Sequence, residues 1–252
     1  IRRQRQMCIR DRKELKPDCL EDIIAGVSLY RPGPMDQIPR YIANKKDPEH
    51  AVYTHPSLKP ILNVTYGCMV YQEQVMQIVR DLAGYSLGRA DLVRRAMGKK
   101  KLDVMAKERE VFIHGQVDED GNVVVPGCVR NGIDEVSANK IFDEMAEFAK
   151  YAFNKSHAAA YAVVAYQTAW LKYYYPVEFM ASLMTSVMDN STKVSEYTLT
   201  CRKMNIEILP PDINEGEGGF SVAGNAIRYG LSAIKGVGRP VIETIIAERE
   251  AN

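Results

Sequence analysis

The densest group of charges in the chain lies in the string SLGRADLVRRAMGKKK, residues 86–101. Six basic side chains stand there against one acid, Asp91. The adjacent Arg94 and Arg95 can each grip phosphate oxygens with two hydrogen bonds, whereas the lysines that follow act as point charges. Because the net charge of the whole chain is only +1, this local clustering favours an anion-binding surface. An ordinary solvated helix end is the alternative, since cations stabilise the C-terminus of a helix.

A second polar group, Asn154 to His157, opens an apolar stretch in the string YAFNKSHAAAY. Lys155 and His157 place positive charge beside the positive end of a helix dipole, which costs roughly 0.3–1 kcal/mol. An anion bound to the free N–H groups of the helix start would reverse that cost. A capped helix start with solvated side chains is the other interpretation, and this stretch alone favours neither.

The helix behind this polar group is predicted to begin at Ser156, its N-cap, and to run to about Tyr174, before Pro176. Apolar side chains cover every face of the predicted helix. That pattern is typical of a buried helix. We therefore expect the polar group to lie at the edge of a packed core.

Apolar residues at helical spacing predict further helices, which must position the two groups. The clearest lies in the string VYQEQVMQIVRDLAG and is closed by Gly84. Glu73, near its start, suits the dipole of that helix. Other helices are expected over residues 13–27, 86–98, 102–113, 133–149, 179–188 and 193–204. The core-facing residues are predicted to be Leu20, Ile23, Ile24 and Val27 in the first of these, Val75, Ile78, Val79 and Leu82 in the clearest, and Leu92, Val93, Ala96 and Met97 in the arginine helix.

Three other segments carry turn signals. Residues 115–128 read as a surface β-hairpin with its turn at Asp120-Gly121. The string LYRPGPM is a rigid proline turn that either presents Arg31 or merely connects two elements. Lys235, Gly236 and Gly238 form a helix–G-x-G–helix pattern, which can offer backbone N–H groups to a DNA phosphate or be a plain glycine turn.

Composition indicates a folded protein, with 46% hydrophobic and 26% charged residues. The five cysteines, at positions 8, 19, 68, 128 and 201, lack zinc-site spacing, which favours a reducing compartment and no structural metal. No apolar run reaches the length of a membrane span and no signal peptide is apparent. We therefore expect a cytoplasmic protein without a membrane partner.

Together these signals predict a mainly α fold with a small β-hairpin insertion. We expect a helical domain over residues 13–204. Residues 205–252 would be the start of a helix-hairpin-helix-like segment, entered through a short α/β stretch. Residues 1–12 have five arginines and no apolar period; we interpret them as a non-native or disordered edge, with a basic nucleic-acid-binding arm as the alternative.

Several long strings resemble the fingers region of one family, the bacterial DNA polymerase III alpha subunits, which are the C-family replicative polymerases. They occur in the order of that family and cover nearly all of the chain from Lys13 to Arg249. The strings are LYRPGPM, TYGCMVYQEQVM, LAGYSLGRADLVRRAMGKK, FAKYAFNKSHAAAYAVVAYQTAWLKYYYPVEFMA, ILPPDIN and IRYGLSAIKGVG.

The resemblance implies a DNA-directed DNA polymerase of chromosome replication, a nucleotidyltransferase whose helical fingers hold the incoming deoxynucleoside triphosphate (dNTP) and the nascent base pair. The implied partners are primer–template DNA, dNTPs and, through the parent chain, the sliding clamp and other replisome subunits. Nucleotide binding is implied for Arg94, Arg95, Lys99, Lys100, Asn154, Lys155, Ser156 and His157. Tyr151 and Phe153 would offer faces to a base or pack in the core. DNA contacts are expected at Arg31, Lys235, Gly236 and Gly238.

The catalytic aspartates of the family lie in the palm, on paired acidic motifs that precede the fingers, and nothing in this sequence matches them. Asp212 in the string PPDIN has Asn214 where a second acid would be needed, so we interpret it as a turn residue. The histidines, at positions 50, 55, 114 and 157, are dispersed. We therefore expect no catalytic residue and no metal ligand here, Mg²⁺ held by the palm, and no activity from this chain alone.

The alternative is a stand-alone, non-catalytic nucleic-acid-binding or replication accessory protein. Such a protein would have the same basic window and G-x-G pattern. A helical domain without a ligand is the third interpretation, and the charge clustering and the resemblance disfavour it.

Overall fold

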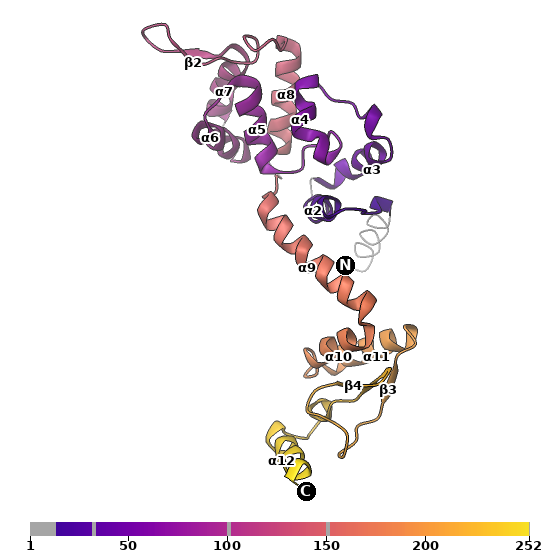
Figure 1. Ribbon diagram of the computed structural model, residues 1–252. Helices are drawn as coiled ribbons and strands as arrows, with labels where there is room; N and C mark the ends of the chain where they lie inside the picture. The colour runs from indigo at the N-terminus through magenta and orange to yellow at the C-terminus, as the bar shows by residue number, and fades with distance from the viewer. Residues whose placement is uncertain (1–13, 32–33, 100–101, 150–151, 252) are drawn as a thin grey trace. The chain divides into compact units, whose positions relative to one another are not determined.

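The computed structural model describes residues 14–31, 34–99, 102–149 and 152–251 (Figure 1). The chain divides into two compact units, Ile1–Val164 and Ala165–Asn252. Helices predominate and the strands form two small sheets, which confirms the mainly α fold class. Across the described residues, every helix is too short or too polar to cross a bilayer. The predicted boundary at Asn205 stays a prediction.

One core of the first unit forms around helix α2, Leu20–Leu29, and helix α3, Ile38–Lys46. The 3₁₀ turn η1, Pro34–Gln37, connects them. Tyr41 and Tyr71 are fully buried there, and Ala158 and Ala162 from the start of helix α9, Lys155–Tyr174, complete the cluster.

The other core of the first unit lies among the helices that carry the arginine pair. Helices α5 and α6 pack against each other, α7 contacts both of them, and α8 packs on α7 (Figure 1). The predicted spacing of α5 is confirmed, because Val75, Ile78 and Val79 are fully buried. The bounds are α4 Lys59–Leu62, α5 Gln72–Ala83, α6 Leu87–Gly98, α7 Leu102–His114 and α8 Glu135–Phe148, with the short 3₁₀ turns η2 Pro48–His50, η3 Pro56–Leu58 and η4 Asn63–Thr65.

The predicted hairpin is confirmed between α7 and α8. Strand β1, Gln116–Val117, pairs antiparallel with strand β2, Val123–Val125. Gly121 has a φ of +82° in the connecting turn. The Asp118 carboxylate accepts bonds from the backbone N–H groups of Asp120 and Asn122, at 3.1 and 2.7 Å. A glycine in the left-handed region and an acceptor side chain two residues before Asp120 explain why the turn forms at this point.

Helix α9, Lys155–Tyr174, ends as predicted but is not buried on all sides. Ala158 and Ala162, one turn apart, are its buried residues, whereas Tyr161 is 59% exposed and Tyr166 53% exposed. The prediction of an all-round buried helix is therefore wrong. The two alanines are small enough to seat one face of the helix against the core, and the large side chains project from its other faces.

Two leucines predicted to face a core are also exposed. Leu20 is 43% exposed in α2, where the buried face contains Asp22, Ile24 and Ala25 instead. Leu92 is 64% exposed in α6. In both helices the true core face is rotated toward small or polar residues, which simple apolar spacing does not detect.

The second unit combines helices with a three-stranded sheet. Strand β5 lies in the middle, parallel to β3 and antiparallel to β4. Met180, Met184 and Phe220 are among the residues that fill its core. The G-x-G segment lies between the 3₁₀ helix η5 and helix α12. The bounds are α10 Pro176–Thr185, α11 Ser191–Lys203, β3 Glu207–Leu209, β4 Ser221–Ala223, β5 Ala226–Arg228, η5 Leu231–Ala233 and α12 Arg239–Ala251.

Candidate functional site

The arginine pair on α6 is organised by Asp91. One carboxylate oxygen, Oδ1, accepts from Nε and Nη2 of Arg94 at 3.1 and 2.7 Å, and Oδ2 lies 2.7 Å from Nη2 of Arg95. The hydrogen bond from Arg94 lowers the pKa of the Asp91 carboxyl. Asp91 therefore stays ionised and holds the two guanidinium groups side by side. Arg94 is 22% exposed and Arg95 61% exposed.

Arg94 also reaches the start of α5. Its Nη1 donates to Oε1 of Gln72 at 3.1 Å, and Nε2 of the same glutamine donates to the carbonyl of Ala152 at 3.0 Å. The backbone N–H of Gln72 donates to the carbonyl of Phe153 at 2.9 Å. One residue thus joins the arginine helix to the segment that leads into α9.

The start of α9 is capped by side chains. The backbone N–H of Lys155 lies 3.1 and 3.0 Å from the two carboxylate oxygens of Glu73, and Nδ2 of Asn154 donates to Glu73 Oε1 at 2.9 Å. Asn154 Oδ1 in turn accepts from the backbone N–H of His157 at 2.9 Å. Ser156 is already inside the helix, so its prediction as the N-cap is wrong. The cap is Asn154, whose short side chain reaches the N–H three residues ahead.

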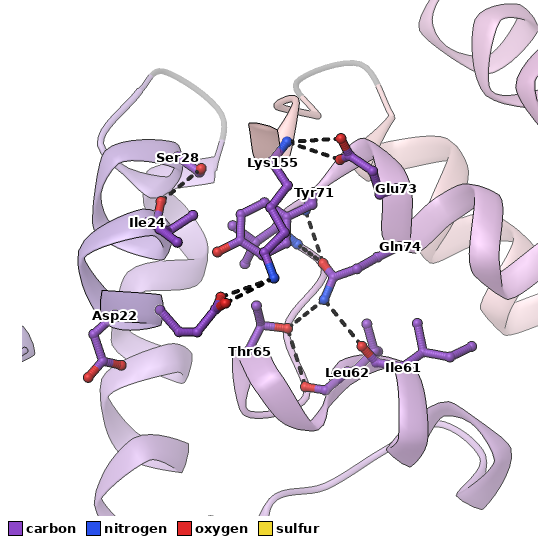
Figure 2. Close-up of polar contacts among 12 residues, drawn as sticks. Asp22, Ile24, Ser28, Ile61, Leu62, Thr65, Tyr71, Glu73, Gln74 and Lys155 are labelled. Atoms are coloured by element: carbon purple, nitrogen blue, oxygen red, sulfur yellow. Dashed lines mark hydrogen bonds and ion pairs between the residues drawn. The ribbon is translucent and has the colours of Figure 1, made fainter. Parts of the chain in front are cut away.

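Lys155 turns its ammonium group back toward α2. Its Nζ lies 3.1 Å from Oε2 of Glu21 and 5.3 Å from the centre of the Tyr71 ring. Figure 2 shows the backbone end of Lys155 beside Glu73 and its side chain running past Tyr71. The positive charge that sequence reasoning found at this helix start is therefore balanced by two glutamates from other helices. Glu73 was expected to serve only the dipole of α5.

Arg31 lies against the same segment. Its guanidinium carbon is 4.2 Å from the centre of the Phe153 ring. Phe153 contacts His157 edge to face, with ring centres 5.3 Å apart, and His157 contacts Tyr161 in the same way at 4.9 Å. Burial lowers the pKa of Arg31. Arg31 thus lies against a row of aromatic rings at the start of α9, a contact that the sequence did not predict. The predicted proline turn itself falls partly on residues 32–33, outside the described residues.

The remaining basic residues of the window differ in their surroundings. Arg89 forms an ion pair with Glu108, 3.2 Å between Nη2 and Oε1, and stacks on Tyr85. Lys99 is exposed at the C-cap of α6. Lys100 and Tyr151 lie outside the described residues. Among the described residues of this window, Arg95 and Lys99 carry the exposed positive charge, with the partly buried Arg94 beside them.

A buried carboxylate that the sequence did not indicate lies in α2. Asp22 is 1% exposed, and its Oδ2 is 2.6 Å from Nζ of Lys45. The Tyr41 hydroxyl donates to its Oδ1 at 3.1 Å. Burial alone would raise the pKa of Asp22, but the bonds from Lys45 and from the Asp18 N–H outweigh it and lower the pKa well below its usual range. Burial also raises the pKa of Tyr66, which lies beside this group, to about 12.

The turn before α5 is fixed by a buried amide. Gln74 Oε1 accepts from the backbone N–H groups of Val70 and Tyr71, at 2.8 and 3.0 Å. Its Nε2 donates to Oγ1 of Thr65 at 2.8 Å (Figure 2). Because every polar atom of the amide has a partner, this glutamine holds the backbone that presents Gln72 and Glu73.

Among the described residues, one cluster has the spacing of a metal site: Asp18, Cys19 and Asp22. The ammonium of Lys45 lies 2.6 Å from Asp22 and 3.4 Å from Asp18, so it already supplies the positive charge. A thiol and a lysine do not suit Mg²⁺, which prefers several oxygen ligands in octahedral geometry. The residues of this cluster therefore do not fit the metal that the resemblance implies.

In the second unit, Lys235, Gly236 and Gly238 are exposed, and Gly236 has a φ of +91°. The segment forms a tight glycine turn directly before α12. Asp212 is a turn residue as predicted, because its Oδ1 accepts from the N–H groups of Asn214 and Glu215 at 2.7 and 3.1 Å.

Two segments of the chain match known protein families. Residues 2–120 match the bacterial DNA polymerase III alpha subunit finger domain. Residues 205–252 match a helix-hairpin-helix motif. The two matches define a polymerase finger region that is followed by a helix-hairpin-helix segment.

Relatives specify the family further. The chain is 52% identical over 238 residues to DNA polymerase III subunit alpha of Xylella fastidiosa, and 51% identical over 249 residues to that of Pasteurella multocida. It is 50% identical over 241 residues to that of Thermus aquaticus. Each match covers 94% of this chain but only 19 or 20% of the relative. The chain belongs to the bacterial DNA polymerase III alpha subunit family and spans about a fifth of the length of these relatives. The accessory-protein alternative is not favoured.

Proposed function

We propose that the chain is the fingers part of a DNA-directed DNA polymerase that copies primer–template DNA, and that it holds the incoming dNTP and the nascent base pair. The observation that carries this proposal is the link through Gln72. It joins Arg94 of α6 to the segment that opens α9. The two groups that could bind parts of one nucleotide are thus in contact within the first unit.

The reaction joins a primer 3′-hydroxyl to the α-phosphorus of the nucleotide and releases pyrophosphate. In such transfers the protein supplies positioning and charge stabilisation more than covalent chemistry. Arg94 and Arg95 hold the β- and γ-phosphates, where negative charge builds as pyrophosphate leaves. Lys99 and Lys100 add point charges nearby.

The hydrogen bonds that Arg94 already makes within the protein support its proposed role in binding the triphosphate. Its contacts to Asp91 and Gln72 use three of the five N–H donors of a guanidinium group, so two remain for phosphate oxygens. Asp91 prevents the two arginines from separating, although their like charges repel each other. A triphosphate therefore meets a pair of cations already held at one place, which reduces the entropy lost on binding.

The start of α9 faces the nucleotide or the nascent base pair. Ser156 and His157 are exposed at this helix start, as is Asn154. Lys155 is paired with Glu21, so an anion bound here would compete with that glutamate for the ammonium group. The edge of the Phe153 ring, held by Arg31, offers a surface to a base, and Arg31 itself and the turn formed by Lys235, Gly236 and Gly238 contact DNA.

Mg²⁺, when bound by the polymerase, neutralises phosphate charge and activates the attacking hydroxyl. We assign it to palm carboxylates outside this chain, because the Asp18, Cys19 and Asp22 cluster does not suit it. The chain alone should then be inactive in primer extension with Mg²⁺, and extension above background would contradict that expectation. The sliding clamp and other replisome subunits are proposed partners of the whole polymerase, in the cytoplasm.

The test of the proposal uses Arg94→Ala and Arg95→Ala in a full-length polymerase that carries this chain. Each change should lower kcat/KM for the nucleotide about 10- to 100-fold, since it removes charge-assisted bonds to phosphate. The Kd for primer–template should change less than the nucleotide KM. Single-nucleotide insertion kinetics and DNA titration measure the two quantities.

Arg80→Ala is the matched control, because Arg80 is also a surface arginine paired to an adjacent acid, Asp81. It should leave the nucleotide KM unchanged. If Arg94→Ala or Arg95→Ala behaved like Arg80→Ala, the assignment of that arginine to the triphosphate would be wrong.

A further inference from the structure

Gln72, the first residue of α5, forms hydrogen bonds to two other segments of the chain. Its Oε1 accepts from Arg94 at 3.1 Å, its Nε2 donates to the Ala152 carbonyl at 3.0 Å, and its backbone N–H donates to the Phe153 carbonyl at 2.9 Å. The side chain is thus held at both ends, by α6 on one side and by the segment before α9 on the other.

The backbone beneath Gln72 is rigid. Tyr71 forms a parallel β-bridge with Phe153, and the buried Gln74 accepts from the N–H of Tyr71 at 3.0 Å. Glu73, the next residue, holds the first N–H of α9. The position of the Gln72 amide is therefore fixed by bonds on both neighbouring residues, and its oxygen is a stationary acceptor for the arginine.

We propose that Gln72 is a positioning residue for nucleotide incorporation, acting through Arg94. It sets the orientation of the Arg94 guanidinium relative to the start of α9. Arg94 can then bind the triphosphate while the start of α9 contacts the base of the same nucleotide. This inference rests on the proposed function. Gln72 itself does not need to touch the nucleotide, because both of its side-chain polar atoms are engaged within the protein.

Asp91 alone would orient the Arg94 guanidinium less firmly than Asp91 and Gln72 do together. Its Oδ1 takes both Nε and Nη2 of Arg94, so the guanidinium can still swing about that single oxygen. The bond from Nη1 to Gln72 adds a second fixed point on the opposite terminal nitrogen. The bonds to Asp91 and Gln72 together determine how the planar guanidinium is oriented. Losing the bond to Gln72 should weaken nucleotide use without removing the positive charge of Arg94.

The experiment uses Gln72→Met in the full-length polymerase, since methionine keeps the length of the side chain but removes both polar atoms. We expect kcat/KM for the nucleotide to fall about tenfold, with less than a twofold change in the Kd for primer–template. Gln72→Asn, one methylene shorter, should act in the same direction while staying polar. Gln77→Met is the matched control. It lies on the same helix, is also half-buried and should leave both constants unchanged.

A double-mutant cycle separates positioning from general damage to the fold. If Gln72 acts through Arg94, adding Gln72→Met to Arg94→Ala should change kcat/KM less than twofold. Multiplicative losses in the double variant would overturn the inference, because they would mean independent roles. A melting temperature equal to that of the parent polymerase checks that the Gln72→Met variant is folded, and Gln72→Asn provides the same comparison if it is not.

The outcomes distinguish this inference from the proposed function. If Arg94→Ala impairs nucleotide use but Gln72→Met and Gln72→Asn do not, the inference is wrong and the triphosphate assignment stands. If Arg94→Ala itself leaves nucleotide use unchanged, the triphosphate assignment fails, and the role of Gln72 fails with it.

Discussion

At the scale of single residues, Asp22 and Lys45 form an ion pair inside the first unit, with 2.6 Å between Oδ2 and Nζ. Both side chains are largely buried, at 1 and 11% exposure. Removing one partner of such a pair leaves the other charge buried and uncompensated. This contact anchors α2 to α3, and α2 also carries Glu21, the partner of Lys155.

Asp22→Asn should lower the free energy of unfolding by about 3–5 kcal/mol at pH 7. The pKa of Asp22 is lowered in the folded state, so the stabilisation is present above the ordinary carboxyl pKa of about 4 and is lost as the pH falls below it. The difference between parent and variant should therefore shrink between pH 5 and pH 2. Urea denaturation across this range measures it.

Asp47→Asn is the control, because Asp47 is 61% exposed in its pair with His50. It should change the free energy of unfolding by less than about 0.5 kcal/mol. A loss for Asp22→Asn that stayed constant down to pH 2 would contradict the role of its ionised form.

The sequence singles out the Arg94 and Arg95 pair by residue type, and the nucleotide-binding role of the pair stays a prediction. The sequence did not indicate Asp22, or the roles of Gln72 and Glu73, for a shared reason. Each of these acts on a partner at least 19 positions away. Local spacing contains no information about such contacts, and a carboxylate in a helix is usually solvated.

At the scale of elements, helix α5 was predicted well, because its apolar spacing and the signals at its start and at its end all favour the same helix. Its end depends on Gly84, which has a φ of +80°. A side-chain carbon at this position would lie 2.6 Å from Cδ of Pro126, in the segment that follows β2. The glycine therefore both terminates the helix and lets the hairpin segment approach it.

Gly84→Ala should destabilise the protein by about 2 kcal/mol or more, because a left-handed conformation alone costs about 1–2 kcal/mol for alanine. Gly88→Ala, inside α6, adds a carbon that meets nothing within 4 Å apart from its own chain neighbours and the local helix backbone, so it should be neutral or stabilise by up to about 1 kcal/mol. Thermal unfolding of both variants gives the comparison. Equal effects at the two positions would contradict this account of Gly84.

Helix α9 shows where prediction by element fails. Its apolar composition predicts burial, yet the packed face consists of Ala158 and Ala162. Small residues let a helix approach a core closely, and they contribute little to a hydrophobicity pattern. The same reason explains the rotated face of α2, where Ala25 and Gly26 are buried and Leu20 is not.

At the scale of the molecule, the two units have separate cores. The core of the second unit includes Met184, which is fully buried and 3.9 Å from the sulfur of Cys201. No pattern in the sequence indicated a division inside α9, because an uninterrupted helix carries no boundary signal.

Met184→Ala should destabilise the second unit by about 2–5 kcal/mol through the cavity that it leaves. Amide hydrogen exchange of the whole chain should then become faster in α10, α11 and the sheet of β3–β5 but not in α5 or α8. Val79→Ala, in the core of the first unit, should give the reverse pattern. Faster exchange in both units from either change would mean that their cores unfold together.

The contacts at the start of α9 also determine when this region can form. Gln72 and Ala152 are 80 residues apart, Glu73 and Lys155 are 82 apart, and Glu21 and Lys155 are 134 apart. Closing such long loops has an entropic cost that must be met before the contacts stabilise anything. These separations predict that helices α5 to α8 assemble before the segment around Asn154 docks onto them. During synthesis on a ribosome, α2 and α5 must wait for the emergence of residues 152–157 before the arginines of α6 acquire their final setting.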